Sequence, residues 1–142
     1  MNAFGKFYEL IMSNPSLSIS IGLFLLFGLV AKAFLFAKCG KPAWASLIPF
    51  YDVIVVLRIV GRPAVHFWLF LIPVFNVYFA AVVLIELAKS FGKYSALDYA
   101  LMLLFNVFYI MNLGLAYNEN YYGPSFNQPI AELKNRKVPM YA

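Results

Sequence analysis

The chain has 142 residues, of which 63% are hydrophobic, 19% aromatic and only 12% charged. Because an average soluble domain carries about 25% charged residues, this composition excludes a water-soluble globular protein and predicts a single-domain integral membrane protein. The formal charge of +5 comes from Lys and Arg residues that stand singly or in pairs at the ends of apolar runs. That distribution is typical of membrane topology signals, so we expect the lipid bilayer as a partner and no nucleic acid.

Four apolar runs carry the hydrophobicity, and a run of about 20 residues crosses a bilayer core as a helix. They cover residues 17–37, 42–57, 64–85 and 99–117. The sequence therefore predicts an all-α integral membrane protein with about three or four membrane segments. We divide it into an N-terminal interfacial segment (1–16), a membrane domain (17–117) and a polar tail (118–142).

The first membrane helix is predicted from about Ser16 to Lys38. Residues 19–30 followed by Ala31-Lys32-Ala33 also fit the apolar core and cleavage site of a signal peptide. The preceding segment balances Lys6 against Glu9 and so lacks the usual positive bias, and we therefore interpret the helix as retained.

Two small residues of this helix, Ser18 and Gly22, lie one turn apart. Small residues at this spacing allow a second membrane helix to approach closely. They are also common in membrane helices without such a partner, and both interpretations stay open.

Three basic glycine turns punctuate the membrane domain. Glycine suits the left-handed residue past a helix end, and basic side chains favour the negative end of the helix dipole. Because basic residues mark the cytoplasmic side, we expect all three turns there. Their residues are Lys38, Gly40 and Lys41, then Arg58, Gly61 and Arg62, then Lys89, Gly92 and Lys93.

The segments between these turns form an internal repeat (42–61 and 63–93). Leu47-Ile48-Pro49-Phe50-Tyr51-Asp52-Val53 returns 24 residues later as Leu71-Ile72-Pro73-Val74-Phe75-Asn76-Val77. Proline breaks a helix, and Asp and Asn are residue types that cap the start of the next one. We therefore expect Pro49 with Asp52, and Pro73 with Asn76, to break one helix and start another.

All three turns reach one side if the proline-broken segments enter the membrane, reverse and return. At about 1.5 Å per residue, residues 43–48 are under ~10 Å long and residues 53–60 about 12 Å, so neither arm spans the core. We therefore expect a re-entrant helical hairpin over 42–60. Residues 64–85 are long enough to span as a proline-kinked helix, so the choice for 63–91 stays open.

The last apolar run, 99–117, contains no proline and is predicted to form a fourth, irregular membrane helix. The tail that follows holds three prolines, which rule out a long helix. Its basic residues favour a cytoplasmic tail; they are Lys134, Arg136 and Lys137.

Side chains suited to catalysis or metal binding are few. A metal site needs clustered ligands, whereas Cys39 and His66 lie in different turns, and a single cysteine forms no intrachain disulfide. Ser46 and Ser90 have no Lys or His at a spacing that identifies a catalytic dyad. We therefore expect no enzyme activity, no metal and no cofactor.

Ionisable residues in a membrane segment suggest function by default. Asp52 is of the type to cap a helix or to pair with Arg58, and Glu86 lies one turn from Lys89. Local pairing is the favoured interpretation, with a proton or ion path as the alternative. Aromatic residues at the ends of runs are expected to anchor at the interface, namely Trp44, Trp68, Tyr121 and Tyr122.

Five motifs follow one another in a fixed order across residues 34–122. They are Lys38-Cys39-Gly40-Lys41-Pro42-Ala43-Trp44, Ile48-Pro49-Phe50-Tyr51, Arg58-Ile59-Val60-Gly61-Arg62-Pro63, Leu71-Ile72-Pro73-Val74-Phe75-Asn76 and Ala88-Lys89-Ser90-Phe91-Gly92-Lys93. This order resembles a small bacterial membrane domain of unassigned function, which stands alone in some bacteria and precedes the catalytic part of signal peptidase I in others.

The resemblance implies the bacterial inner membrane. In the fused proteins the domain must end in the cytoplasm for the peptidase anchor to deliver its catalytic part outward, so a cytoplasmic C-terminus is implied here. No residue of this chain matches the serine–lysine catalytic motifs, and none is carried over.

We expect a non-enzymatic membrane subunit, an accessory or scaffold of a larger complex linked to protein export or signal-peptide processing. Its partners would be other membrane-protein subunits. The alternative is a small channel or carrier whose broken helices meet in mid-membrane, which at this length would form a homo-oligomer.

Overall fold

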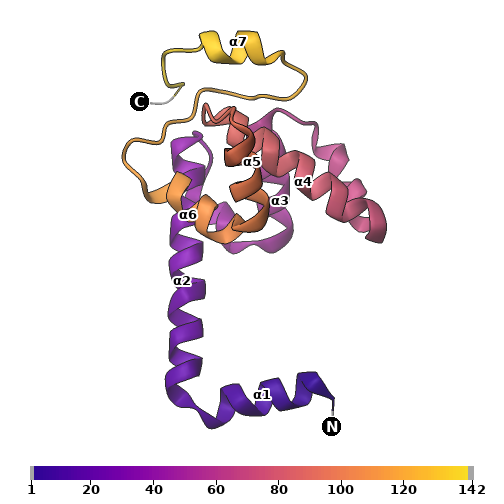
Figure 1. Cartoon of the computed structure of the whole chain (residues 1–142), viewed down its shortest axis with the longest axis vertical. Coiled ribbons are helices and arrows are strands. Elements are labelled where there is room, and N and C mark those ends of the chain that lie inside the picture. The colour runs from indigo at the N-terminus through magenta and orange to yellow at the C-terminus, as the bar shows by residue number, and fades with distance from the viewer. Residues whose placement is uncertain (1, 141–142) are drawn as a thin grey trace.

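The fold is built on one long helix (Figure 1). The computed structural model describes residues 2–140, and α2 (Pro15–Lys38) is its longest element. Its 24 residues measure about 36 Å at 1.5 Å per residue, enough to cross a bilayer core. The helix predicted from about Ser16 to Lys38 is thus confirmed. A shorter helix, α1 (Ala3–Ser13), runs across the N-terminal end of α2 and buries none of its residues.

The remaining elements gather around the C-terminal half of α2 (Figure 1). All secondary structure in residues 2–140 is helical. In order, the elements are η1 (Ala43–Leu47), α3 (Pro49–Val60), η2 (Ala64–Leu71), α4 (Pro73–Ser90), α5 (Ala96–Leu104), α6 (Asn106–Leu115) and α7 (Ile130–Asn135). One core joins α2 with the elements from η1 to α6, and its buried residues include Phe36 of α2, Leu57 of α3, Leu87 of α4 and Met102 of α5.

The two repeat units have the same local structure. In each, a 3-10 helix ends just before the proline, and the proline opens an α-helix. Proline is favourable at that position because its missing N–H has no partner in the first turn and its φ is already helical.

The capping role expected of Asp52 and Asn76 is wrong. Ile48 and Ile72 occupy the cap positions, and neither cap makes a side-chain hydrogen bond. The backbone N–H groups of Asp52 and Asn76 donate to the carbonyls of Ile48 (2.8 Å) and Ile72 (2.7 Å). Both residues therefore lie inside the first helical turn, because proline moves the start of the helix four residues earlier than the Asp/Asn signal suggests.

The three glycine turns adopt the expected conformation. Gly40, Gly61 and Gly92 have φ values of 65°, 91° and 76°, which is the left-handed region that glycine favours. In each turn the residue after the glycine donates its N–H to the carbonyl five residues back. These bonds join Lys41 to Phe36 (2.9 Å), Arg62 to Leu57 (2.8 Å) and Lys93 to Ala88 (3.0 Å). Three helices thus end in the same Schellman-type cap.

The irregular helix predicted over 99–117 is divided into two. The chain forms α5 and α6, which bend by 112° at Phe105. The two halves have different neighbours, since α5 packs on α4 whereas α6 packs on α2. Gly114 of α6 fits directly against the backbone of Ala31, where an ideal Cβ would lie 2.1 Å from the Ala31 carbonyl oxygen. Tertiary packing therefore overrides the continuous apolar pattern.

Within residues 2–140, two helices, α2 and α4, are long and apolar enough to cross a membrane, and α5 with α6 would count as a third if the bent pair is one span. This arrangement indicates a helical membrane protein.

Candidate functional site

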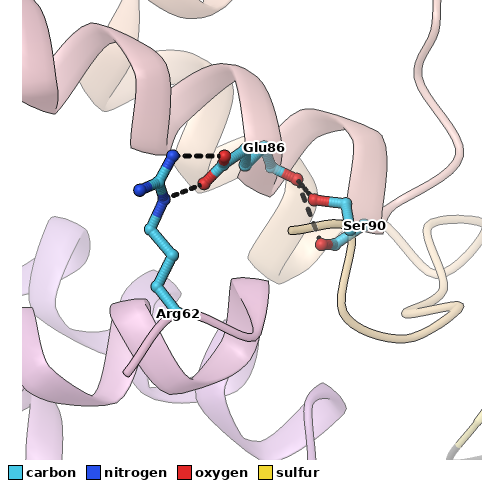
Figure 2. Close-up of polar contacts among 4 residues, drawn as sticks. Arg62, Glu86 and Ser90 are labelled. Atoms are coloured by element: carbon cyan, nitrogen blue, oxygen red, sulfur yellow. Dashed lines mark hydrogen bonds and ion pairs between the residues drawn. The ribbon is translucent and has the colours of Figure 1, made fainter. Parts of the chain in front are cut away.

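A buried ion pair joins the second glycine turn to α4 (Figure 2). Arg62 donates from Nε to Glu86 Oε2 and from Nη2 to Glu86 Oε1, both at 2.6 Å. The two side chains are only 13% and 12% exposed. A bidentate guanidinium–carboxylate pair of this kind is geometrically specific and stronger than a neutral hydrogen bond. We call Arg62, Glu86 and the groups bonded to them the Arg62 joint.

Aromatic rings enclose the guanidinium of the Arg62 joint. Arg62 Cζ lies 5.1 Å from the centroid of Phe79 and 4.4 Å from that of Phe126, within cation–π range. His66 packs edge-on against the same two rings at 6.0 Å. His66 therefore packs within this aromatic group. Cys39, the other metal-ligand candidate, is buried at the end of α2. Among residues 2–140 no three His, Cys, Asp or Glu residues gather as a metal site.

The tail crosses the ends of α3 and α4 as a strap, which we define as residues 121–126. Its backbone N–H groups at Ser125 and Phe126 donate to the carbonyl of Val60 (3.0 and 2.8 Å), and that of Tyr122 donates to Ser90 (2.9 Å). The hydroxyl of Ser125 donates to the Glu86 carbonyl (2.6 Å), which also accepts from Ser90 (Figure 2). The strap thus satisfies carbonyls that a helix end leaves without partners.

Tyr121 is a buried structural residue and not the interface anchor expected from the sequence. Its ring is buried against Phe91, and its hydroxyl donates to the Ile59 carbonyl at 2.6 Å. Replacing Tyr121 with phenylalanine is expected to lower the free energy of unfolding by about 1 kcal/mol, because the ring still packs while the Ile59 carbonyl loses a donor. SDS-titrated unfolding in micelles measures this, with the partly buried Tyr122→Phe as the matched control. An unchanged midpoint would contradict the role.

A second ion pair joins α2 to α3 inside the bundle. Asp52 is 8% exposed and pairs with Lys32. It does not pair with Arg58, the partner expected from the sequence, which is exposed on α3. The other carboxylate oxygen of Asp52, Oδ1, is buried without a hydrogen-bond partner among the described residues. Asp52 therefore keeps a free acceptor in an apolar setting, where unsatisfied polar groups are costly.

A groove of about 490 Å³ runs between α2 and α6 beside this pair. Lys32 and Asn106 line it together with apolar side chains such as Phe24 and Ile110. Asn106 Oδ1 is likewise buried without a partner within residues 2–140. The groove thus combines the Lys32 ammonium and the Asn106 side chain with an otherwise apolar lining, which suits a ligand that carries a hydrogen-bonding group.

The other predicted pairing, Glu86 with Lys89, is also wrong. Lys89 Nζ instead lies 5.8 Å from the centroid of the Tyr99 ring on α5. Tertiary partners displaced both local pairs, because Glu86 faces the second turn and Asp52 faces α2. One sequence signal pointed this way: a charge inside an apolar run requires an opposite charge, and Lys32 and Asp52 stand alone in theirs.

The basic residues of the first and third turns bind the ends of other elements. Lys38 donates to the carbonyls of Leu113 (2.9 Å) and Ala116 (2.6 Å), at the end of α6. Lys93 pairs with Glu119 of the tail at 2.7 Å. The candidate catalytic serines Ser46 and Ser90 both donate to carbonyls of their own helices. The turns thus tie the C-terminal ends of α2, α3, α4 and α6 to one end of the molecule.

Cys39 lies at the end of α2 with 1% exposure, and burial raises the pKa of its thiol above the ordinary value. Because the thiolate is the reactive form, the folded protein is expected to resist maleimide at pH 7 to 8, whereas SDS-unfolded protein labels fully. Gel-shift labelling with a maleimide polymer measures both states. Equal labelling rates in the two states would contradict this burial.

Together these features define an all-helical membrane protein whose buried ion pairs and strap hold broken helices against one long helix. The chain belongs to DUF5684, a family of unknown function, whose model matches residues 44–124. That match begins in η1 and ends within the strap at Pro124. No curated protein and no solved structure matches the chain.

Proposed function

We propose that the protein is a non-enzymatic integral membrane subunit, an accessory or scaffold of a larger complex. The observation that carries this proposal is the bare N-terminal half of α2. Residues 15–27 are exposed apart from the half-buried Ser18, and the buried residues of α2 begin only at Ala31. The stretch is about 20 Å long, so it offers a lateral docking surface for another membrane helix.

Small residues favour one face of this stretch for docking. An ideal Cβ at Gly22 would meet nothing within 4 Å, and Ser18 lies one turn before it. A partner helix could therefore approach its backbone closely, as small residues allow in membranes. A link to bacterial protein export or signal-peptide processing is supported by the ordered motifs of residues 34–122, and the identity of the partner tests it.

We propose further that η1–α3, η2–α4 and α5–α6 are three re-entrant hairpins which enter and leave on the tail side. Two observations support this. Lys38 and the strap tie the ends of α2, α3, α4 and α6 together. The reversals carry exposed apolar side chains and no charge, including Phe50, Val74 and Leu104. Such tips suit the hydrocarbon core, whereas the end of a spanning segment would meet polar headgroups.

The tail side is then the cytoplasm. Nine of the eleven Lys and Arg residues lie in the three turns or in the tail. Positive residues accumulate on the cytoplasmic side of membrane proteins, which supports a cytoplasmic C-terminus. Single-span α2 would place α1 at the opposite surface.

Affinity purification in mild detergent tests the scaffold proposal. We expect the full chain to recover unrelated membrane subunits in fixed ratio, and Gly22→Leu to reduce that recovery strongly because it fills the open face. Phe27→Leu is the matched control, since Phe27 is exposed on the other side of α2. Recovery of a lone homo-oligomer that ignores Gly22→Leu would overturn the proposal.

The alternative is a small oligomeric channel or carrier, favoured by the Lys32–Asp52 pair and its neighbouring groove. The spare acceptors Asp52 Oδ1 and Asn106 Oδ1 would serve a passing proton or cation. A proton or cation flux across vesicles that contain the protein, abolished by Asp52→Asn, would support this function over the scaffold. The absence of any such flux at every membrane potential applied would count against it.

A further inference from the structure

A polar pocket lies where the tail meets the third glycine turn, and its wall is strongly basic. It measures about 580 Å³ and is separate from the Arg62 joint and the α2–α6 groove. Four basic side chains line it together with one carboxylate, giving an excess of three positive charges. They are Lys93, Lys134, Arg136 and Lys137, with Glu119.

Most of this positive charge is not neutralised within the described chain. Lys93 pairs with Glu119 at 2.7 Å. Arg136 instead donates to neutral acceptors, the carbonyls of Tyr122 (3.3 Å) and Pro124 (2.9 Å) and the amide oxygen of Gln128. Lys134 Nζ lies 5.9 Å from the centroid of the Tyr94 ring, and Lys137 is exposed. The contacts of Arg136 and Lys134 are therefore to neutral groups, which leave both charges for a ligand.

The wall of the pocket is also fixed and rich in hydrogen-bond donors. Leu133 of α7 is 2% exposed, and Lys134 and Lys137, which follow it in the chain, line the cavity together with it. Asn118 and Asn120 add amide groups. The pocket begins at Gly92 and Lys93, directly after the apolar α4 ends, which places it at the level of the membrane surface.

We propose that this pocket binds a phosphate-bearing anion. Several converging ammonium and guanidinium groups beside amide donors recognise phosphate, and basic pockets at a cytoplasmic membrane surface take anionic lipid headgroups. The same chemistry would also accept a soluble phosphate, and the two sources are distinguished by experiment. The site is independent of the scaffold function, because it lies at the opposite end of α2 from the bare stretch.

Native mass spectrometry of the full chain in detergent tests the site with phosphatidylglycerol, phosphatidylcholine and glycerol phosphate as probes. The variant Lys134→Gln/Lys137→Gln is expected to bind the anionic probe about 25-fold more weakly, since each basic residue near the surface contributes about fivefold. Lys134→Arg/Lys137→Arg should retain binding, and Lys6→Gln, exposed on α1, is the matched control.

Selective retention of phosphatidylglycerol over phosphatidylcholine supports a lipid headgroup, and binding of glycerol phosphate supports a soluble source. Both outcomes require the loss in the double Gln variant. Equal binding by wild type, the double Gln variant and Lys6→Gln, or binding that does not discriminate phosphatidylglycerol from phosphatidylcholine and ignores glycerol phosphate, overturns the proposal.

Discussion

Replacing Glu86 with alanine is expected to lower the free energy of unfolding by about 3–5 kcal/mol, because Arg62 then stays buried without a counter-charge. The ion pair is bidentate at 2.6 Å, with both side chains at least 87% buried. The hydrogen bond from the Ser125 hydroxyl to the Glu86 backbone carbonyl does not depend on the side chain, so the substitution tests the ion pair itself. SDS-titrated unfolding of the full chain in micelles measures the change.

A double variant separates the charge from the packing. Arg62→Met/Glu86→Leu removes both charges and is expected to recover most of the stability lost in Glu86→Ala, because no unpaired charge remains buried. Glu132→Ala is the matched control, since Glu132 is exposed on α7 and forms no ion pair among residues 2–140. A loss in Glu86→Ala no larger than in Glu132→Ala would show that the Arg62 joint is dispensable.

The same Gly→Ala change at two positions is expected to have opposite effects. At Gly114 a Cβ would lie 2.1 Å from the Ala31 carbonyl oxygen, which is backbone and cannot rotate away. Gly114→Ala must therefore push α6 from α2, and we expect a loss of about 1–3 kcal/mol or more. At Gly22 nothing lies within 4 Å, so Gly22→Ala should be neutral or gain up to about 1 kcal/mol of helix stability.

Unfolding midpoints of the two variants in one detergent give the comparison directly. The order of stability expected is Gly22→Ala, then wild type, then Gly114→Ala. If Gly114→Ala matched wild type, the close crossing of α2 and α6 at Ala31 would be incorrect.

Local patterns predicted the elements whose cause is local. The length of α2, the breaks at Pro49 and Pro73, and the left-handed glycines all follow from apolar run length and backbone sterics. The bend at Phe105 does not, because nothing in residues 99–117 forbids a straight helix. It results from competition between two neighbours, α4 and α2, which only the folded chain brings near.

The polar interactions show the same contrast between what local sequence determines and what tertiary packing determines. Charge balance indicates that Asp52 and Glu86 need partners, but local spacing favoured Arg58 and Lys89, which lie six and three residues further along the same helices. The actual partners are Lys32 and Arg62, which are 20 and 24 residues away. The choice between the local and the distant partners depends on which face of each helix turns inward, and packing around α2 determines that face.

The proposed topology has the η1–α3, η2–α4 and α5–α6 segments entering and leaving the membrane on one side. Three exposed alanines stand at their starts, Ala43, Ala64 and Ala96, and exposed apolar residues stand near two tips, Val74 at 88% and Leu104 at 77%. Each is replaced singly by cysteine in a Cys39→Ala background, in which no other thiol reacts. Lys6→Cys on α1 reports the opposite surface.

A membrane-impermeant maleimide is then applied to either face of sealed vesicles. We expect the three alanine positions to label from the cytoplasmic face only, Lys6→Cys to label from the other face only, and the two tip positions to label from neither. Labelling of Ala64→Cys or Ala96→Cys from the outer face, or of either tip from that face, would contradict it.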